Sequence, residues 1–169
     1  MNLTESANQG WQFEKWTDSG AGTYTGTSPS VSVVVTGPLS ENATFYVQLA
    51  IAADGGTNVA YSYSSGSGTV HAGTTKTLYV PPSSNVTLRA SPSLFVYSFA
   101  SWQGAGLAKP AKPSVALVVT SPSAVTGTSS LDYPLISAIA AAAVLVVLAG
   151  SLLIRNRRRR ESGWAFPPA

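Results

Sequence analysis

One apolar stretch near the end of the chain constrains the fold more than any other feature. Residues 135–154 carry no charged side chain, and Ser137 and Ser151 are their only polar residues. About 20 apolar residues are what an α-helix needs to cross the hydrocarbon core of a bilayer, and no polar stripe of helical period marks this one as the core helix of a soluble protein. The sequence therefore predicts one transmembrane helix, with Asp132 as its cap and Pro134 in its first turn.

Arginines directly after the apolar stretch predict the direction in which the helix crosses the membrane. Basic residues gather on the cytoplasmic side of a transmembrane helix. We therefore expect a single-pass protein of the cell membrane, with a basic cytoplasmic tail over residues 155–169 and an extracellular region before Pro134. The residues that determine this topology are Arg155, Arg157, Arg158, Arg159 and Arg160.

The net charge of +3 is divided unevenly by this stretch. The preceding region has five basic and six acidic side chains, whereas five Arg and one Glu follow the stretch. Basic charge confined to the tail suits anionic lipid headgroups. Nucleic-acid binding needs a basic surface spread over a folded face. We therefore expect the lipid bilayer as a partner, and we expect no binding of nucleic acid.

The start of the chain does not explain how the preceding region would be exported. Residues 1–5 have neither the basic segment nor the apolar segment of a signal peptide. About 134 residues must nevertheless cross the membrane in the topology predicted from the Lys and Arg distribution. We therefore expect this chain to be the C-terminal part of a longer precursor. The chain has no cysteine, which excludes disulfides, thiol catalysis and cysteine-ligated metals.

An internal repeat organises the region before the helix. Residues 29–38 read PSVSVVVTGP and residues 113–122 read PSVALVVTSP. Each copy follows a block that ends in a tryptophan, Trp16 or Trp102, and a glycine-containing turn. Matching order across two blocks indicates a true repeat. The first copy lacks the segment that begins near Tyr46 in the second.

The expected domains follow from this repeat. Residues 1–45 form the C-terminal half of a β-repeat module, 46–129 a full module, 130–134 a short stalk, 135–154 the transmembrane helix, and 155–169 the tail. The expected fold class is an all-β ectodomain of small antiparallel sandwich- or barrel-like modules plus one C-terminal transmembrane α-helix.

Short runs of β-branched and aromatic residues between Gly, Pro, Asp and Ser clusters carry this prediction. The predicted strands are 31–35, 45–51, 59–63, 77–80, 86–90, 95–99 and 115–119. The expected core residues are Trp16, Val33, Val35, Phe45, Val47, Tyr61, Tyr79, Leu88, Phe99, Trp102, Leu117 and Val119.

The order of motifs resembles a known family. A strand such as Val86-Thr87-Leu88 leads to Phe-x-x-Trp, at Phe13 and again at Phe99. A glycine-rich turn, a valine-rich strand and the sequence GPLSENATF over 37–45 follow. This pattern resembles the divergent internalin-type B-repeat of bacterial and archaeal surface proteins, over about residues 2–129. The resemblance implies extracellular spacer or adhesion modules with compact β-folds and no catalytic residues.

The combination of this repeat with a C-terminal helix and arginine tail also looks like archaeal surface proteins. Some of those carry thermopsin-like peptidase domains upstream, and no such domain is visible in this sequence. Two alternatives to a spacer therefore stay open: the C-terminal anchor of a surface hydrolase, or a subunit of a membrane or envelope assembly. In the second case, Ala138 and residues 140–143 would allow close helix approach.

Two motifs were weighed as catalytic or metal-binding groups. Asp18-Ser19-Gly20 matches the Asp-Ser/Thr-Gly motif of aspartic proteases, but that chemistry needs a second carboxylate and the sequence has no second copy of the motif. His71 is the only histidine, so neither a zinc site nor a triad can be assembled from sequence spacing. We therefore expect no catalytic, cofactor-binding or metal-binding residue, and no enzyme activity.

The remaining motifs concern the surface. Asn2, Asn42 and Asn85 each begin an Asn-x-Thr triplet, which predicts possible N-glycosylation sites in an extracellular region. Trp164 and Phe166 in the tail suggest weak contact with the membrane surface, and the alternative is a partner-binding motif. Other envelope proteins or surface glycans are further possible partners.

Overall fold

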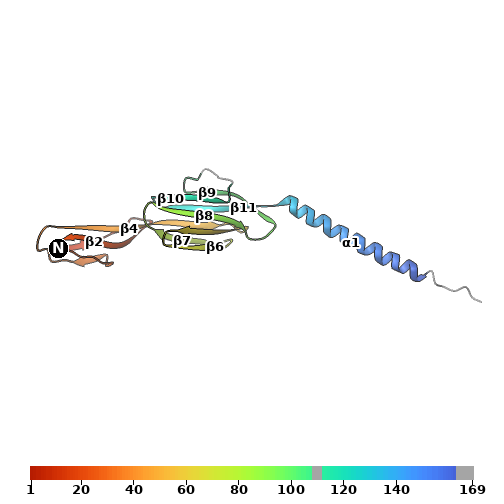
Figure 1. Cartoon of the computed structure of the whole chain (residues 1–169), viewed down its shortest axis with the longest axis horizontal. Helices are drawn as coiled ribbons and strands as arrows, with labels where there is room; N and C mark the ends of the chain where they lie inside the picture. The colour runs from red at the N-terminus through yellow and green to blue at the C-terminus, as the bar shows by residue number, and fades with distance from the viewer. Residues whose placement is uncertain (108–111, 163–169) are drawn as a thin grey trace, which may run out of the picture. The chain divides into compact units, whose positions relative to one another are not determined.

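The computed structural model describes residues 1–107 and 112–162 (Figure 1). It divides into two compact units that meet between Ser130 and Leu131. The first unit consists of β-strands, and the second contains the helix α1 (Tyr133–Ser162). The fold class predicted from the sequence, a β-sheet region followed by one long apolar C-terminal helix, is confirmed.

Most of the first unit is a sandwich of two sheets. A core cluster of buried aliphatic side chains and Trp102 fills it. One sheet has the order β10-β8-β5-β6, and in the other β4 pairs with β7 and β11, and β11 with β9. The strands are β4 (Leu39–Ala53), β5 (Thr57–Tyr63), β6 (Gly66–Val70), β7 (Thr75–Val80), β8 (Ser84–Pro92), β9 (Tyr97–Gly104), β10 (Ser114–Val119) and β11 (Ser123–Leu131).

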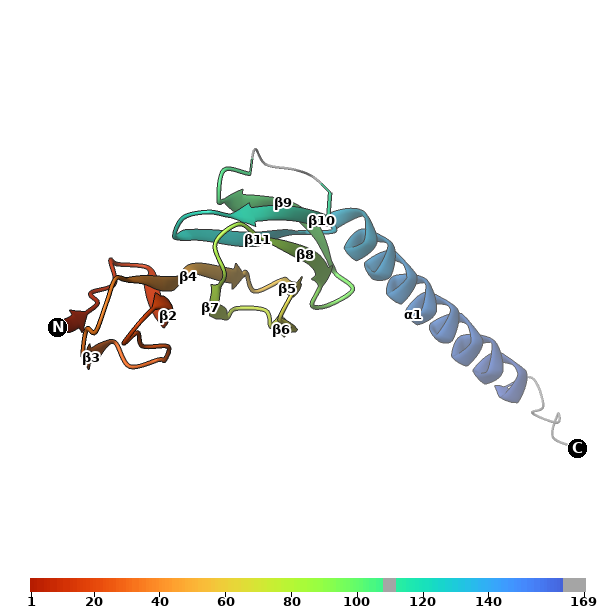
Figure 2. The same cartoon turned by 60° about the vertical axis from the view of Figure 1, so that its left-hand side comes forward.

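The N-terminal part of the unit contains β1 (Asn2–Thr4), β2 (Trp11–Gly20) and β3 (Ser30–Ser32), and it joins the sandwich through β4 (Figures 1 and 2). β2 pairs with the first half of β4, from Leu39 to Val47, and β11 pairs with the second half, from Leu49 to Ala53. The boundary expected between residues 45 and 46 therefore falls inside one continuous strand.

Backbone pairing shows that the N-terminal strands repeat half of the sandwich. β1 pairs with β3 as β8 pairs with β10, both antiparallel. The Glu5 N–H donates to the Pro29 carbonyl (3.0 Å), and the Ala90 N–H donates to the Pro113 carbonyl (2.7 Å). This register aligns Leu3 with Leu88, so the two Asn-x-Thr triplets at Asn2 and Asn85 do not occupy equivalent positions.

Seven of the twelve expected core residues are buried, Phe45, Tyr61 and Phe99 are half-buried, and Tyr79 and Val35 are exposed. Tyr79 is 41% exposed because its neighbours Leu78 and Val80 point inward, and successive side chains of a strand alternate between faces. Val35 is 48% exposed, although Val119, at the same place in the second copy, is fully buried. Val119 pairs with Ser84 of β8, whereas β3 ends at Ser32 and leaves Val35 without a partner strand.

The chain passes from β11 to α1 with one intervening residue, Asp132. Its carboxylate accepts a hydrogen bond from the Leu135 N–H (3.1 Å), which confirms the predicted helix cap. Residues 130–134, expected as a stalk, therefore belong to the end of β11 and the start of α1. The tail 163–169, with Trp164 and Phe166, lies outside the described residues, as do the side chains of Arg159 and Arg160.

Candidate functional surfaces

A tryptophan holds the long loop of each repeat copy against its sheet. The indole Nε1 of Trp16 donates to the carbonyl of Ser28 (3.0 Å), and that of Trp102 donates to the carbonyl of Lys112 (3.0 Å). In both copies the accepting residue directly precedes the proline that opens the valine-rich segment. The tryptophan of the Phe-x-x-Trp motif therefore has the same structural role twice.

A phenylalanine completes each of these sites. The rings of Phe13 and Trp16 are 5.6 Å apart at 55°, and those of Phe99 and Trp102 are 5.3 Å apart at 51°. Tilted aromatic pairs at such separations are favourable. The duplicated geometry stabilises the modules, and it leaves neither indole N–H available for a ligand.

The carboxylate of Asp54, which the sequence places in an Asp-Gly-Gly turn without the carboxylate cluster of a calcium site, joins the turn after β4 to the end of β11. Both oxygens of Asp54 accept a hydrogen bond from the Ser129 hydroxyl (2.9 Å each), and the Gly56 N–H donates to one of them (3.1 Å). Ser129 occupies the position that Phe45 has in the first copy. This replacement of an aromatic residue by a serine is the sequence feature that could have indicated a polar contact between Asp54 and Ser129. The contact fixes the last strand three residues before Asp132.

Hydrogen bonding also determines the ionisation of Asp54. Partial burial raises the pKa of its carboxyl, but hydrogen bonds from the backbone N–H and hydroxyl of Ser129 and from the Gly56 N–H more than offset this effect. The net result is a pKa below the ordinary value. Asp54 is thus held as the anion, in a role that stabilises the fold.

The two motifs weighed as catalytic groups lie far apart in the fold and have local hydrogen-bond partners. Asp18 on β2 accepts a hydrogen bond from the Thr25 hydroxyl (2.6 Å), and hydrogen bonds from Thr23 and Thr25 lower its pKa. His71 lies in the turn after β6, where its carbonyl accepts from the Thr74 hydroxyl (2.7 Å). Over the residues that the structure describes, no group of three His, Cys, Asp or Glu side chains could hold a metal ion.

The duplicated tryptophan geometry can now be compared with known proteins. Residues 1–49 match the divergent InlB B-repeat domain. The comparisons with curated proteins and with solved structures found no match. The family match confirms the resemblance inferred from the motifs and supports a surface-associated repeat module. It covers the first copy of the repeat and the first half of β4.

The second copy lies outside that match, and its likeness to the first copy is seen in the structure. It repeats the tryptophan hydrogen bond, the aromatic pair and the backbone bond to the proline carbonyl. The two glycine-rich turns also agree, because Gly20 and Gly22 have left-handed φ angles, as do Gly104 and Gly106. The two copies within the unit 1–130 therefore share these local features of structure.

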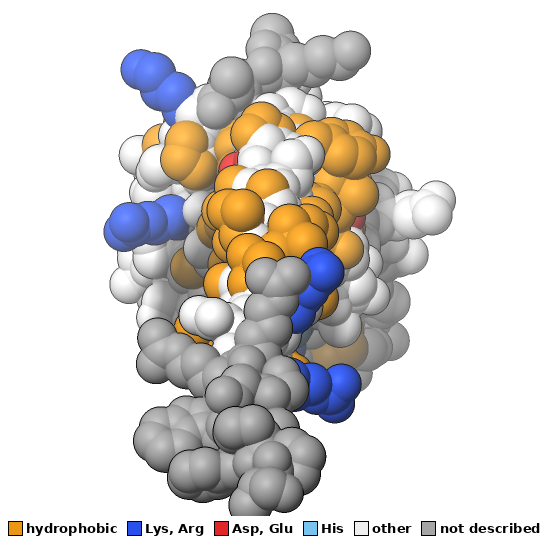
Figure 3. Space-filling view, turned by 90° about the vertical axis from the view of Figure 1, so that its right-hand side faces the viewer, with side chains coloured by type: hydrophobic (Ala, Val, Ile, Leu, Met, Phe, Trp, Pro, Cys, Tyr) orange, Lys and Arg blue, Asp and Glu red, His pale blue; other side chains and the backbone are white. Residues whose placement is uncertain are grey.

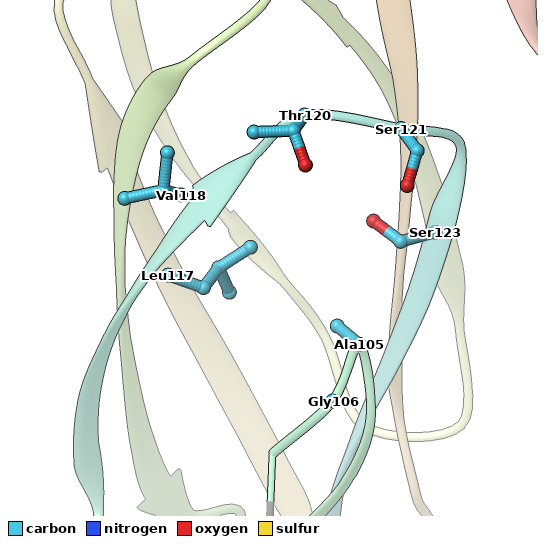
Figure 4. A pocket seen from close by; sticks show the side chains of 7 residues that line it. All are labelled: Ala105, Gly106, Leu117, Val118, Thr120, Ser121 and Ser123. Atoms are coloured by element: carbon cyan, nitrogen blue, oxygen red, sulfur yellow. The ribbon is translucent and has the colours of Figure 1, made fainter.

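An open hollow of about 340 Å³ lies beside the turn between β10 and β11 in the second B-repeat copy (Figure 4). Its polar side chains are hydroxyls, and none of the lining residues titrates in the physiological range. The hollow therefore offers hydrogen bonds but no acid or base. The lining residues are Ala105, Gly106, Leu117, Val118, Thr120, Ser121 and Ser123.

The three predicted glycosylation sites are exposed residues of strands. The side-chain oxygen of Asn2 accepts a hydrogen bond from the Ser32 hydroxyl (2.6 Å), so this site is engaged within its sheet. Asn42 on β4 and Asn85 on β8 face solvent. Glycosylation stays a prediction at all three.

The helix α1 exposes many apolar side chains between residues 135 and 154 (Figure 3). Residues 144–148 are each more than half exposed. Over Tyr133–Arg158 the helix is long and apolar enough to cross a membrane, and among the described residues it is the only helix that is. Arg155, Arg157 and Arg158 follow this apolar part and are exposed.

Proposed function

We propose that this chain is a single-pass cell-surface protein whose β-repeat unit is extracellular and whose arginine tail is cytoplasmic. An exposed apolar helix of this length is unfavourable in water and favourable in a bilayer. The adjacent Arg155, Arg157 and Arg158 favour the inside for the C-terminal end. The match to a B-repeat domain supports a location at the surface.

Within this setting, the β unit acts as a spacer that holds its N-terminal end away from the membrane. The observation that carries this proposal is the continuity of β4, which pairs with β2 over its first half and with β7 and β11 over its second half. Its 15 residues span about 50 Å at strand geometry. Hydrogen bonds on both halves of this strand oppose bending between the repeat copies, which supports the spacer role.

A non-catalytic role is part of the same proposal. Hydrogen bonds within the fold engage the indole N–H groups of both tryptophans and the carboxylates of Asp54 and Asp18. The exposed surface is formed mainly by hydroxyl side chains and apolar groups. Such a surface suits contact with glycans or other envelope proteins, so adhesion is a second use of the same unit.

Energy transfer to lipid tests the spacer function. The chain has no cysteine, so a single dye can be placed at Ser19→Cys, near the far end of β2, or at Ser65→Cys, in the turn after β5. In the full-length protein in vesicles with acceptor lipids, we expect clearly weaker transfer from residue 19 than from residue 65. Two glycines inserted after Val47 should reduce this difference. Equal transfer from both positions would contradict the spacer.

A further inference from the structure

The hydrogen-bonded turn Leu94–Tyr97, which leads from β8 into β9, consists of apolar and aromatic residues, and Leu94 and Phe95 are exposed. The Tyr97 N–H donates to the carbonyl of Leu94 (3.1 Å), which closes a four-residue turn with the sequence Leu-Phe-Val-Tyr. Leu94 is 59% exposed and Phe95 is 70% exposed. Exposed turns are normally built from Gly, Pro, Asn, Asp and Ser. Ser91, Pro92 and Ser93 directly precede the turn, but none of these residue types occurs within Leu94–Tyr97, where Leu94 and Phe95 are exposed.

Hydrogen bonds place this turn at one particular end of the sandwich. The Ser93 N–H donates to the Gly56 carbonyl (2.9 Å), and the Ser93 hydroxyl donates to the Gly55 carbonyl (3.3 Å). The same turn after β4 contains Asp54, which holds Ser129 near the end of β11. The apolar turn therefore lies at the end of the unit from which the chain leaves for α1.

The covalent connection keeps this end close to the start of the helix. The hydroxyls of Ser98 and Ser130 are hydrogen-bonded (3.2 Å), and Phe95 is three residues before Ser98. Only Leu131 and Asp132 separate Ser130 from α1. A fully extended segment of three residues, the separation between Ser130 and the first residue of α1, spans at most about 11 Å. The headgroup layer on each side of the hydrocarbon core is about 5–8 Å thick, so the two lengths are comparable. A helix that spans the bilayer thus confines this end to the membrane surface.

We propose that Leu94 and Phe95 insert into the headgroup layer of the bilayer that α1 spans. This inference rests on the proposed anchoring by α1. Leucine and aromatic side chains are the types that enter the boundary between headgroups and acyl chains. The turn would then be a second attachment of the chain to the membrane, in addition to α1.

The charges near this end agree with a lipid surface. Lys76 pairs with Ile51, two residues before the end of β4, and Lys112 directly precedes the proline whose carbonyl bonds Ala90. Both lysines are exposed, and their ammonium groups can reach lipid phosphates. The Asp54 carboxylate at the same end is held by its bonds to Ser129 and Gly56.

Depth-dependent quenching tests the inserted turn. An environment-sensitive dye is attached to Leu94→Cys in the full-length protein, in phosphatidylcholine vesicles that contain lipid with a nitroxide near its headgroup. We expect emission at shorter wavelength and strong quenching. Ser65→Cys, in the turn after β5 at the other end of the sandwich, is the matched control and should show neither. Quenching at residue 94 as weak as at residue 65 would overturn the inference.

A third position separates this inference from the anchoring on which it rests. Dye on Ala138→Cys reports whether α1 lies in the bilayer. Quenching at residue 138 without quenching at residue 94 refutes the inserted turn and leaves the anchor intact. Absence of quenching at residue 138 refutes the anchor itself.

A label outside the turn excludes an effect of the dye's own affinity for lipid. His71→Cys lies at the same end of the sandwich, because Gly73 in its turn donates hydrogen bonds to the carbonyls of Ala53 and Asp54. Replacing both Leu94 and Phe95 by Ser should lower quenching at residue 71 toward the level at residue 65. Unchanged quenching in this folded variant would show that the two apolar side chains do not hold the unit to the membrane.

Discussion

Single side chains in this protein show how a repeat keeps its architecture while it changes its chemistry. Trp16 and Trp102 make the same hydrogen bond to the carbonyl that precedes a proline. At another equivalent position the copies differ, because Ser129 replaces Phe45. An aromatic residue would fill space there, whereas the serine donates to Asp54 and fastens the last strand before the membrane.

The charge of Asp54 makes a prediction about pH. Its folded pKa lies below the unfolded value of about 3.9. Such a group stabilises the fold above the unfolded pKa, and the stabilisation is lost as pH falls through the folded pKa. We expect Asp54→Asn to lower the free energy of unfolding at pH 7 by about 1 kcal/mol, a modest value because solvent reaches the carboxylate.

Denaturant unfolding of the full chain in detergent, followed by circular dichroism, measures this effect. The difference between wild type and Asp54→Asn should shrink below about pH 4 and disappear once Asp54 is protonated in both states. A difference that stays constant from neutral to acidic pH would show that the charge is not its source.

The strands themselves show how far sequence reasoning reaches in this protein. Residues 59–63, 77–80, 86–90 and 115–119 were predicted as strands and lie within β5, β7, β8 and β10. Their alternating branched and aromatic residues reflect burial of one face, which sequence can show. The apolar helix was visible as a continuous run without charge, and the tryptophan repeat as two blocks with the same order of motifs.

The strands that sequence reasoning missed depend on their neighbours. β6 has the sequence Gly-Ser-Gly-Thr-Val, and the ring of Tyr61 on β5 lies where a side chain on Gly68 would stand. In β11, Gly127 packs beneath Val59 and Trp102. Both strands gain their stability from partners distant in sequence, which local propensity cannot reveal. The turn Leu94–Tyr97 was likewise read as the start of a strand, because apolar residues in a turn violate the usual pattern.

The glycine-rich turns give a prediction at the scale of the element. A Cβ on Gly104 would lie 2.2 Å from the carbonyl oxygen of Ala124, at a φ of +87°. Gly106 has a φ of +70° but open space around it. We expect Gly106→Ala to cost about 1 kcal/mol from φ alone, and Gly104→Ala to cost more than about 2 kcal/mol because β11 must also shift.

Chemical unfolding of the two variants separates the clash between a Cβ at residue 104 and the Ala124 carbonyl from the cost of a positive φ angle, which both variants share. Gly106→Ala is the matched control, since it lies two residues away and shares the left-handed backbone. Equal losses in the two variants would mean that contact between this turn and β11 does not determine the position of the turn.

The whole molecule combines two units with different solvents. The β unit buries its apolar side chains in its own core, whereas α1 exposes them and is long and apolar enough to cross a membrane. The half repeat and the full repeat share β4, so a force applied at the N-terminal strands is carried along one hydrogen-bonded strand to the sandwich. Asp54 and Ser129 then link that sandwich to the strand that leads into α1.

The central claim, a β-repeat unit held outside the cell by α1, is tested most directly by labelling single cysteines in intact cells. The full chain with Ser65→Cys, or with Ala169→Cys in the tail, is exposed to a maleimide that cannot cross membranes. We predict that residue 65 is labelled in intact cells and that residue 169 is labelled only after the membrane is opened. Labelling of residue 169 alone in intact cells, or a protein that carbonate washes from the membrane, would contradict the account.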